Sequence, residues 1–165
     1  MLLGLYVYIC GLSFVNLIEQ RIVYMRDTML RQHRDYALFQ AYQKALEEHE
    51  FNSQREAINF VTRSKAPQWF VSKEFCAAVL SGLLRGKELY KMGKQKRRKF
   101  AALMELYLQK KQEFPYCGMP HLTLCGEIVE MEAPEWFIGY QMASKIINEQ
   151  IAIRNDRMAR RYARH

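Results

Sequence analysis

The chain has 165 residues, of which 50% are hydrophobic and 25% charged, which fits one globular domain better than two full enzyme domains and excludes disordered and collagen-like proteins. Only 8 Gly and 4 Pro interrupt it, so we expect an all-α fold of six or seven helices rather than a turn-rich β-sandwich. Lys and Arg total 25 against 17 acids, for a net charge of +8. This excess indicates either a nucleic acid or an anionic membrane surface as partner, or a solvated basic face that only keeps the protein soluble.

Residues 1–24 form an apolar amino-terminal segment, in which residues 2–18 carry no charge. That stretch is slightly shorter than the about 20 residues that typically span a bilayer, and no preceding cation or small-x-small site marks a cleaved signal peptide. Three interpretations stay open: an extra helix, a membrane anchor through residues 1–18 with its carboxyl side in the cytoplasm, or a start codon assigned too far upstream. We treat residues 25–165 as a single helical domain.

Two helices are predicted before the first proline of that domain. The first covers residues 26–49, and a capping box formed by Ser53 and Glu56 predicts a second over residues 54–64. Pro67 stops it, because proline donates no amide hydrogen and disfavours the helical conformation at the preceding residue. The apolar side chains that we expect to face inward from the first helix are Tyr36, Phe39, Tyr42 and Leu46.

An internal repeat is the most specific feature of the sequence. The segment Ala66–Ser72 reads Ala-Pro-Gln-Trp-Phe-Val-Ser and recurs 67 residues later as Ala133–Gly139, Ala-Pro-Glu-Trp-Phe-Ile-Gly. The 2 Trp of the chain occupy the same place in both copies. We interpret each copy as helix, proline turn and helix, at about residues 53–86 and 120–153. The Trp-Phe pair is interpreted as a hydrophobic clamp that fixes the angle between the two helices of a copy. Because such a helix pair cannot bury its apolar face alone, the two copies are expected to pack about an approximate two-fold axis, covered by the long helices.

The helices that follow each turn are also marked in the sequence. Ser72 caps a helix that ends near Gly86, whereas Gly139 supplies a weaker cap for a longer helix that runs into the Arg-rich tail. Between the copies, a long helix over residues 94–114 is ended by Pro115. The apolar stripe predicted for this long helix consists of Phe100, Leu103, Met104, Tyr107 and Leu108.

Two basic patches hold the excess positive charge, and each is expected to contact phosphate groups of DNA or RNA. The first patch begins the long helix, where cations oppose the helix macrodipole unless an anion binds there. We expect the two patches to grip one nucleic acid if they converge in space. Tyr90 and Tyr162 lie near the patches and can stack on bases, but core or amphipathic surface roles fit tyrosines at this density better. The first basic patch is Lys94, Lys96, Arg97, Arg98 and Lys99, and the second basic patch is Arg157, Arg160, Arg161 and Arg164.

Sequence-specific DNA recognition by the repeat is a weaker hypothesis. The second helix of a helix-turn-helix reads bases with Arg, Lys, Asn or Gln near its start. The first copy offers only Lys73 and Glu74 before apolar residues, and the connector Ala66–Ser72 is longer than a tight turn. The second copy offers a better set, namely Gln141, Ser144, Lys145, Asn148 and Arg154.

No motif points to catalysis, a cofactor or a metal ion. The chain has no phosphate-binding glycine loop, no His-Glu-x-x-His and no Gly-x-Ser-x-Gly, and we interpret Glu127, Glu130 and Glu132 as solvent-facing acids. Cys117, His121 and Cys125 are four residues apart, but Gly118 and Pro120 interrupt the helix and a fourth ligand is missing. The 4 Cys form no Cys-x-x-Cys pair, which suits free thiols in a reducing compartment such as the cytoplasm.

The sequence therefore favours a non-enzymatic protein that binds nucleic acid through its basic patches. The alternative is a helical interaction or structural adaptor, which binds a protein partner and is tethered to the inner membrane if residues 1–18 insert. The oligomeric state, the choice between DNA and RNA, and the biological process are not readable from the residues.

The repeat also carries a resemblance to a known set of proteins. The segments Ala66–Ser72 and Ala133–Gly139, with Leu-Tyr-Lys-Met at residues 89–92, resemble the paired Pro-x-aromatic-aromatic-Val-Ser segments of a set of short, basic helical proteins from Bacteroides-type gut bacteria. The resemblance does not cover residues 1–24. It implies a helical fold and no particular activity.

Overall fold

A computed structural model describes residues 28–163, and every regular element in that range is a helix, as the composition predicts. The expectations for residues 1–24 lie outside the described range, and none of the described helices is long and apolar enough to cross a membrane. The described helices are residues 28–48, α2 (Gln54–Arg63), α3 (Lys73–Leu84), α4 (Lys94–Lys110), the 3₁₀ turn η1 (Tyr116–Gly118), α5 (His121–Glu130) and α6 (Tyr140–Tyr162).

The predicted helix caps are present. At the start of α2, Ser53 Oγ accepts a hydrogen bond from the Glu56 amide at 3.2 Å, and the Glu56 carboxylate accepts one from the Asn52 amide at 3.0 Å. This is a capping box whose return bond reaches one residue further back than the usual motif. Ser72 caps α3 in the same way, and Gly86 ends it at φ +79°, a left-handed conformation that glycine adopts without strain.

Two predicted apolar stripes need correction. In helix 28–48, Phe39 and Tyr42 are buried as expected, but Tyr36 is 52% exposed and Leu46 is 48% exposed. The buried stripe instead runs through Leu38, Phe39, Tyr42 and Ala45, because the helix turns a slightly different face to the core than the aromatic residues suggested.

The long helix α4 is shorter than predicted. It ends at Lys110 rather than at Phe114. Between Lys110 and Pro115 the chain forms turns, in which the Gln112 amide donates to the Gln109 carbonyl and the Glu113 amide donates to the Lys110 carbonyl. Of the predicted stripe, Phe100, Leu103 and Tyr107 are buried, Met104 is partly buried, and Leu108 is 43% exposed.

The connectors Ala66–Ser72 and Ala133–Gly139 contact each other about an approximate two-fold axis, as the repeat predicted. Ala66 and Ala133, which are equivalent in the two copies, form an isolated antiparallel bridge through two hydrogen bonds of 2.9 Å. The Trp69 amide donates to the Val129 carbonyl at 3.1 Å, and the equivalent Trp136 amide donates to the Thr62 carbonyl at 3.3 Å. Each copy therefore satisfies backbone groups of the other.

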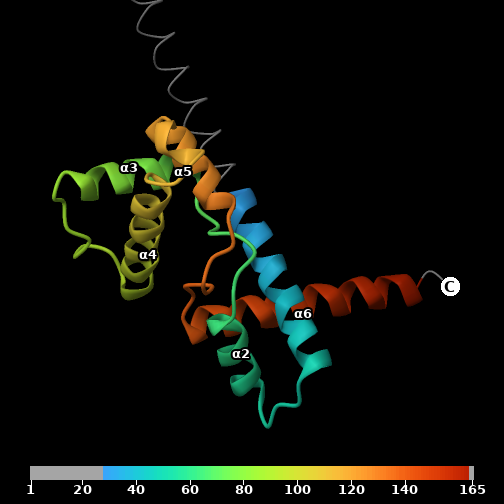
Figure 1. Ribbon diagram of the computed structural model, residues 1–165. Coiled ribbons are helices and arrows are strands. Elements are labelled where there is room, and N and C mark those ends of the chain that lie inside the picture. The colour runs from blue at the N-terminus through green and yellow to red at the C-terminus, as the bar shows by residue number, and fades with distance from the viewer. Residues whose placement is uncertain (1–27, 164–165) are drawn as a thin grey trace, which may run out of the picture.

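The helices exchange partners across this axis, which the hairpin interpretation did not anticipate. The principal contacts join α3 to α5 and α2 to α6 (Figure 1), so each helix packs on a helix of the other copy rather than on its own neighbour in sequence. The reason is that each connector is extended and crosses the other, so it carries the second helix away from the first. The remaining long helix, α4, covers both α3 and α5.

The aromatic residues of the connectors stack between the copies. Trp69 stacks on Phe137 with ring centroids 5.5 Å apart, and Phe70 stacks on Trp136 at 5.7 Å. Both Trp side chains are buried. Phe70 and Phe137 have φ values of +47° and +51°, which cost each of these residues backbone strain. The predicted clamp thus exists, but it joins the two copies instead of fixing the angle within one.

We predict that Trp69→Ala and Trp136→Ala each lower the free energy of unfolding by on the order of 3 to 5 kcal/mol, because each removes a buried ring from this stack. Urea unfolding followed by circular dichroism measures the loss, and Phe114→Ala, at a side chain that is 91% exposed, is the control. An unchanged unfolding midpoint in either Trp variant contradicts the clamp.

The helices that follow the two connectors begin with different caps, Ser72 for α3 and Gly139 for α6. Gly139, which replaces Ser72 in the second copy, has φ −75° and ψ 154°, and an added Cβ would meet only Gln95 Nε2 at 4.0 Å. Gly139→Ser is expected to raise the free energy of unfolding by about 0.5 to 1 kcal/mol, and Ser72→Gly to lower it by a similar amount. A loss of stability in Gly139→Ser, measured by the same urea titration, would show that the cap geometry is wrong.

Candidate nucleic-acid interface

The first basic patch lies on the first turns of α4, and part of it is engaged within the fold. Arg98 forms an ion pair with Glu135 at 2.7 Å. The Lys99 ammonium donates to the Phe70 carbonyl oxygen at 3.3 Å, while the Lys96 ammonium lies 5.4 Å from the ring centroid of Phe75. Lys94 and Arg97 are exposed. This patch therefore offers less cationic surface to a large polyanion than its composition suggested.

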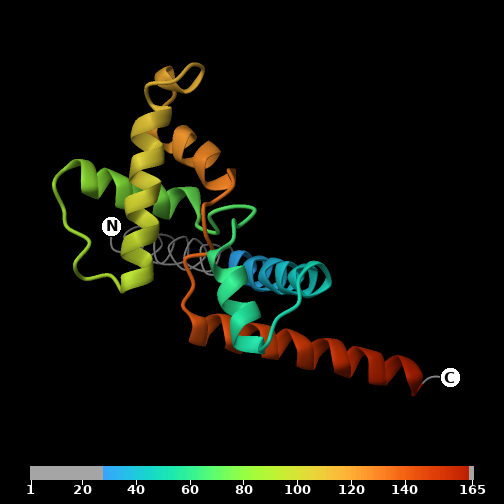
Figure 2. The same cartoon turned by 60° about the horizontal axis from the view of Figure 1, so that its bottom comes forward.

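The second basic patch lies on a helix end that stands clear of the rest of the molecule. Residues 152–162 of α6 are exposed throughout, and α6 extends well past the other helices (Figure 2). Arg160 pairs with Asp156 at 2.8 Å, and Arg164 lies outside the described residues. The helical spacing of Arg154, Arg157 and Arg161 places them on one face of this segment.

The two basic patches do not converge, so the condition under which they would grip one nucleic acid together is not met. The start of α4 lies beside the start of α6, where Arg98 meets Glu135 and Gln95 lies close to Gly139. From Gly139, α6 runs about 27 Å before it reaches Arg157, and the views in Figures 1 and 2 place its end on the far side of the molecule from α4. The sequence located both patches but not their separation.

Each second helix of the repeat packs along one face on other helices of the domain. In the first copy, α3 packs against both α4 and α5, and the Lys73 side chain lies close to Gly126 of α5, where it would be 3.5 Å from an added Cβ. In the second copy, the amino-terminal half of α6 packs on α2, and Asn148 accepts a hydrogen bond from Gln54 at 3.1 Å. Of the residues suggested for base readout, Arg154 lies on the protruding half of α6. Tyr90 and Tyr162, which were considered for stacking on bases, are exposed.

Of the residues considered as metal ligands, His121 and Cys125 contact other groups, and Cys117 is an exposed thiol. His121 Nε2 lies 2.9 Å from the Ala77 carbonyl oxygen and must donate to it, so in the neutral ring Nδ1 accepts from the Tyr107 hydroxyl at 2.9 Å. A hydrogen bond with Cys125, together with burial, holds the pKa of the Cys76 thiol well above its ordinary value. Over residues 28–163, no group of three or more His, Cys, Asp or Glu side chains is close enough to hold a metal ion.

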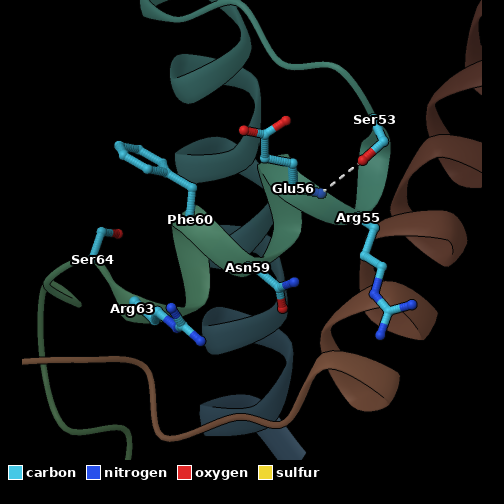
Figure 3. A pocket seen from close by; sticks show the side chains of 7 residues that line it. All are labelled: Ser53, Arg55, Glu56, Asn59, Phe60, Arg63 and Ser64. Carbon is cyan, nitrogen blue, oxygen red and sulfur yellow. Dashed lines mark hydrogen bonds between the residues drawn. The ribbon is translucent and has the colours of Figure 1, made fainter.

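A hollow of about 750 Å³ lies along the outer face of α2. Its lining side chains all come from α2 and its two ends, and Figure 3 shows them pointing away from one another rather than toward a common point. Arg55 is turned toward α6, where its guanidinium lies 5.3 Å from the Tyr140 ring centroid. This surface has no convergent polar groups and is the face of an exposed helix.

A second pocket, which the sequence did not indicate, has a volume of about 630 Å³ and lies where helix 28–48, the starts of α3 and α4, and both connectors meet. Lys99 lines it together with Lys96 from the first basic patch and with Arg31 and Arg34 from helix 28–48. Burial, with Arg34 and Lys96 nearby, lowers the pKa of Lys99 from 10.5 to about 8. A helix-by-helix reading does not find this cluster, because its cations come from segments about 60 residues apart.

The comparisons with known proteins add no assignment to this geometry. No protein-family model, no curated protein and no solved structure matches the chain.

We predict that Lys99→Met raises the free energy of unfolding at pH 7 by about 1 to 3 kcal/mol, since the charged ammonium is disfavoured in the fold. The pKa of Lys99 is about 8 in the folded protein against 10.5 ordinarily, so the unfolded chain binds this proton more tightly. The penalty is therefore complete below about pH 8 and disappears as the pH rises toward 10.5.

Urea titrations at pH 7 and above pH 10 measure this difference between wild type and variant, with the exposed Lys94→Met as the control. A gain for Lys99→Met that does not shrink with rising pH is inconsistent with the lowered pKa.

Proposed function

We propose that the protein is not an enzyme and binds nucleic acid through phosphate contacts, made mainly by the protruding half of α6. The observation that carries this proposal is the row of exposed guanidinium groups on Arg154, Arg157 and Arg161, on a helical segment that covers no other part of the described chain. Guanidinium groups bind phosphate oxygens in bidentate fashion.

The position of this segment supports contact with an extended polyanion. A helix that stands clear of the body can approach a groove or a single strand without a clash from the rest of the domain. The row from Arg154 to Arg161 is about 10 Å long, so it meets several neighbouring phosphates. Because these groups carry no base-specific geometry in common, we expect little sequence preference.

The first basic patch has a secondary role in this proposal. Lys94 and Arg97 are exposed at the start of α4 and add to the long-range attraction of a polyanion. Arg98, held by Glu135, contributes less. We place this activity in the cytoplasm, where thiols such as Cys76 stay reduced.

We predict that replacing Arg154, Arg157 and Arg161 by Ala weakens duplex DNA and RNA binding and lowers its dependence on salt. Each neutralised phosphate contributes about 0.9 to the slope of log K against log salt concentration for duplex DNA. The triple variant should therefore reduce the slope by about 2 to 3. Fluorescence anisotropy over a salt series measures both effects.

The matched control removes three exposed cations elsewhere, Lys44, Lys87 and Lys91, and so lowers the net charge equally. Equal effects of the two triple variants would mean that only net charge matters, and an absence of binding by wild type at low salt overturns the proposal.

One observation favours an adaptor function as the second candidate. Met158 and Tyr162 lie one helical turn apart on the protruding segment and are 42% and 75% exposed, so a protein partner can cover them. Binding to such a partner would withstand high salt and be lost in a variant with Met158→Ser and Tyr162→Ser, whereas phosphate binding would show the reverse behaviour.

A further inference from the structure

The pocket between the connectors and the start of α4 combines an aromatic wall with a cationic rim. Its wall includes Phe70 of the first connector and Trp136 and Phe137 of the second, with Phe75 and Phe100 nearby. The volume of about 630 Å³ lies within the range of small-molecule sites. The pocket is thus shaped by the same stacked rings that join the two copies of the repeat.

Positive charge dominates this pocket. Arg31, Arg34, Lys96 and Lys99 line it, and among the described lining residues Glu74 carries the one carboxylate. Arg34 is oriented by Asp35, whose carboxylate it meets at 2.6 Å. The ammonium of Lys99 has a carbonyl oxygen as its hydrogen-bond acceptor, not a carboxylate.

This arrangement is unfavourable without an anion. Burial of the Lys99 ammonium is the main cause of its lowered pKa, and the positive charges of Arg34 and Lys96 lower it further. Structural lysines at such sites are normally paired with an acid. A bound anion supplies the missing negative charge. It also accepts hydrogen bonds from the Lys99 ammonium, which has three N–H donors and gives one of them to the Phe70 carbonyl oxygen.

We propose that this pocket binds a small organic anion, whose aromatic or apolar body lies against the connector rings and whose carboxylate or phosphate group meets Lys99, Lys96 and Arg34. The aromatic wall favours a flat ring system over an inorganic ion, because an ion alone would leave the rings uncovered. This ligand is separate from the nucleic acid of the proposed function, since the pocket lies at the start of α4 and the protruding half of α6 points away from it.

The experiment uses the full 165-residue chain at pH 7 and low salt. Isothermal titration calorimetry with 2-naphthoate, 2-naphthyl phosphate and the neutral 2-naphthalenemethanol compares one ring system with three head groups. We expect at least one anion to bind about tenfold or more tightly than the neutral alcohol, and the stronger of the two anions identifies the head group.

Two variants locate the binding. Lys99→Met is expected to weaken anion binding by about tenfold or more while binding of the neutral probe is retained. Since this variant should be more stable than wild type, unfolding cannot account for the loss. Lys94→Met, on the same helix but outside the pocket, is the control and should bind as wild type does.

The proposal is overturned if the wild-type protein binds neither anion at about 1 mM. It is also overturned if Lys99→Met and the wild type bind the anions equally tightly. Duplex binding by the same preparations is measured in parallel. Duplex binding is expected to depend mainly on the α6 arginines. Its presence or absence is therefore a test of the proposed function that is separate from anion binding in the pocket.

Discussion

The antiparallel contact between the two connectors determines where four of the helices lie. Two backbone bonds join Ala66 to Ala133, and the stacked pairs of Trp69 with Phe137 and Phe70 with Trp136 flank them. Because each connector crosses to the other copy, α2 packs on α6 and α3 packs on α5. The strain of the two positive φ values is balanced there by ring burial.

The same contact separates the charged surfaces of the molecule. It directs α6 away from α4, so the arginines at the end of α6 stand in solvent while the cations at the start of α4 gather beside the connectors. One arrangement of the backbone therefore produces an open cationic helix, suited to a long polyanion, and a concave cationic pocket, suited to a small one. The two sites differ in exposure more than in composition.

Local features of the fold were predictable from the sequence because their causes are local. Ser53 and Ser72 cap helices through residues three positions away, Pro67 stops one by its own ring, and Gly86 ends another by adopting a positive φ. The exchange of helices was not predictable, since the same apolar pattern suits a hairpin and a crossed pair equally. For the candidate site, the arginines of α6 were identified, whereas the grouping of Lys99 with Arg34 depends on tertiary packing that no single segment encodes.

The crossed connectors also determine the order in which the protein can fold during its synthesis. On the ribosome, α2 emerges long before α6, its packing partner, and the intervening residues 64–139 take about 4 to 15 s to synthesise at typical rates. Throughout that interval the apolar face of α2, with Ile58 and Val61, has no native cover from α6. The nascent chain consequently completes its fold only after nearly all of it has left the ribosome, so neither copy of the repeat is an independent folding unit.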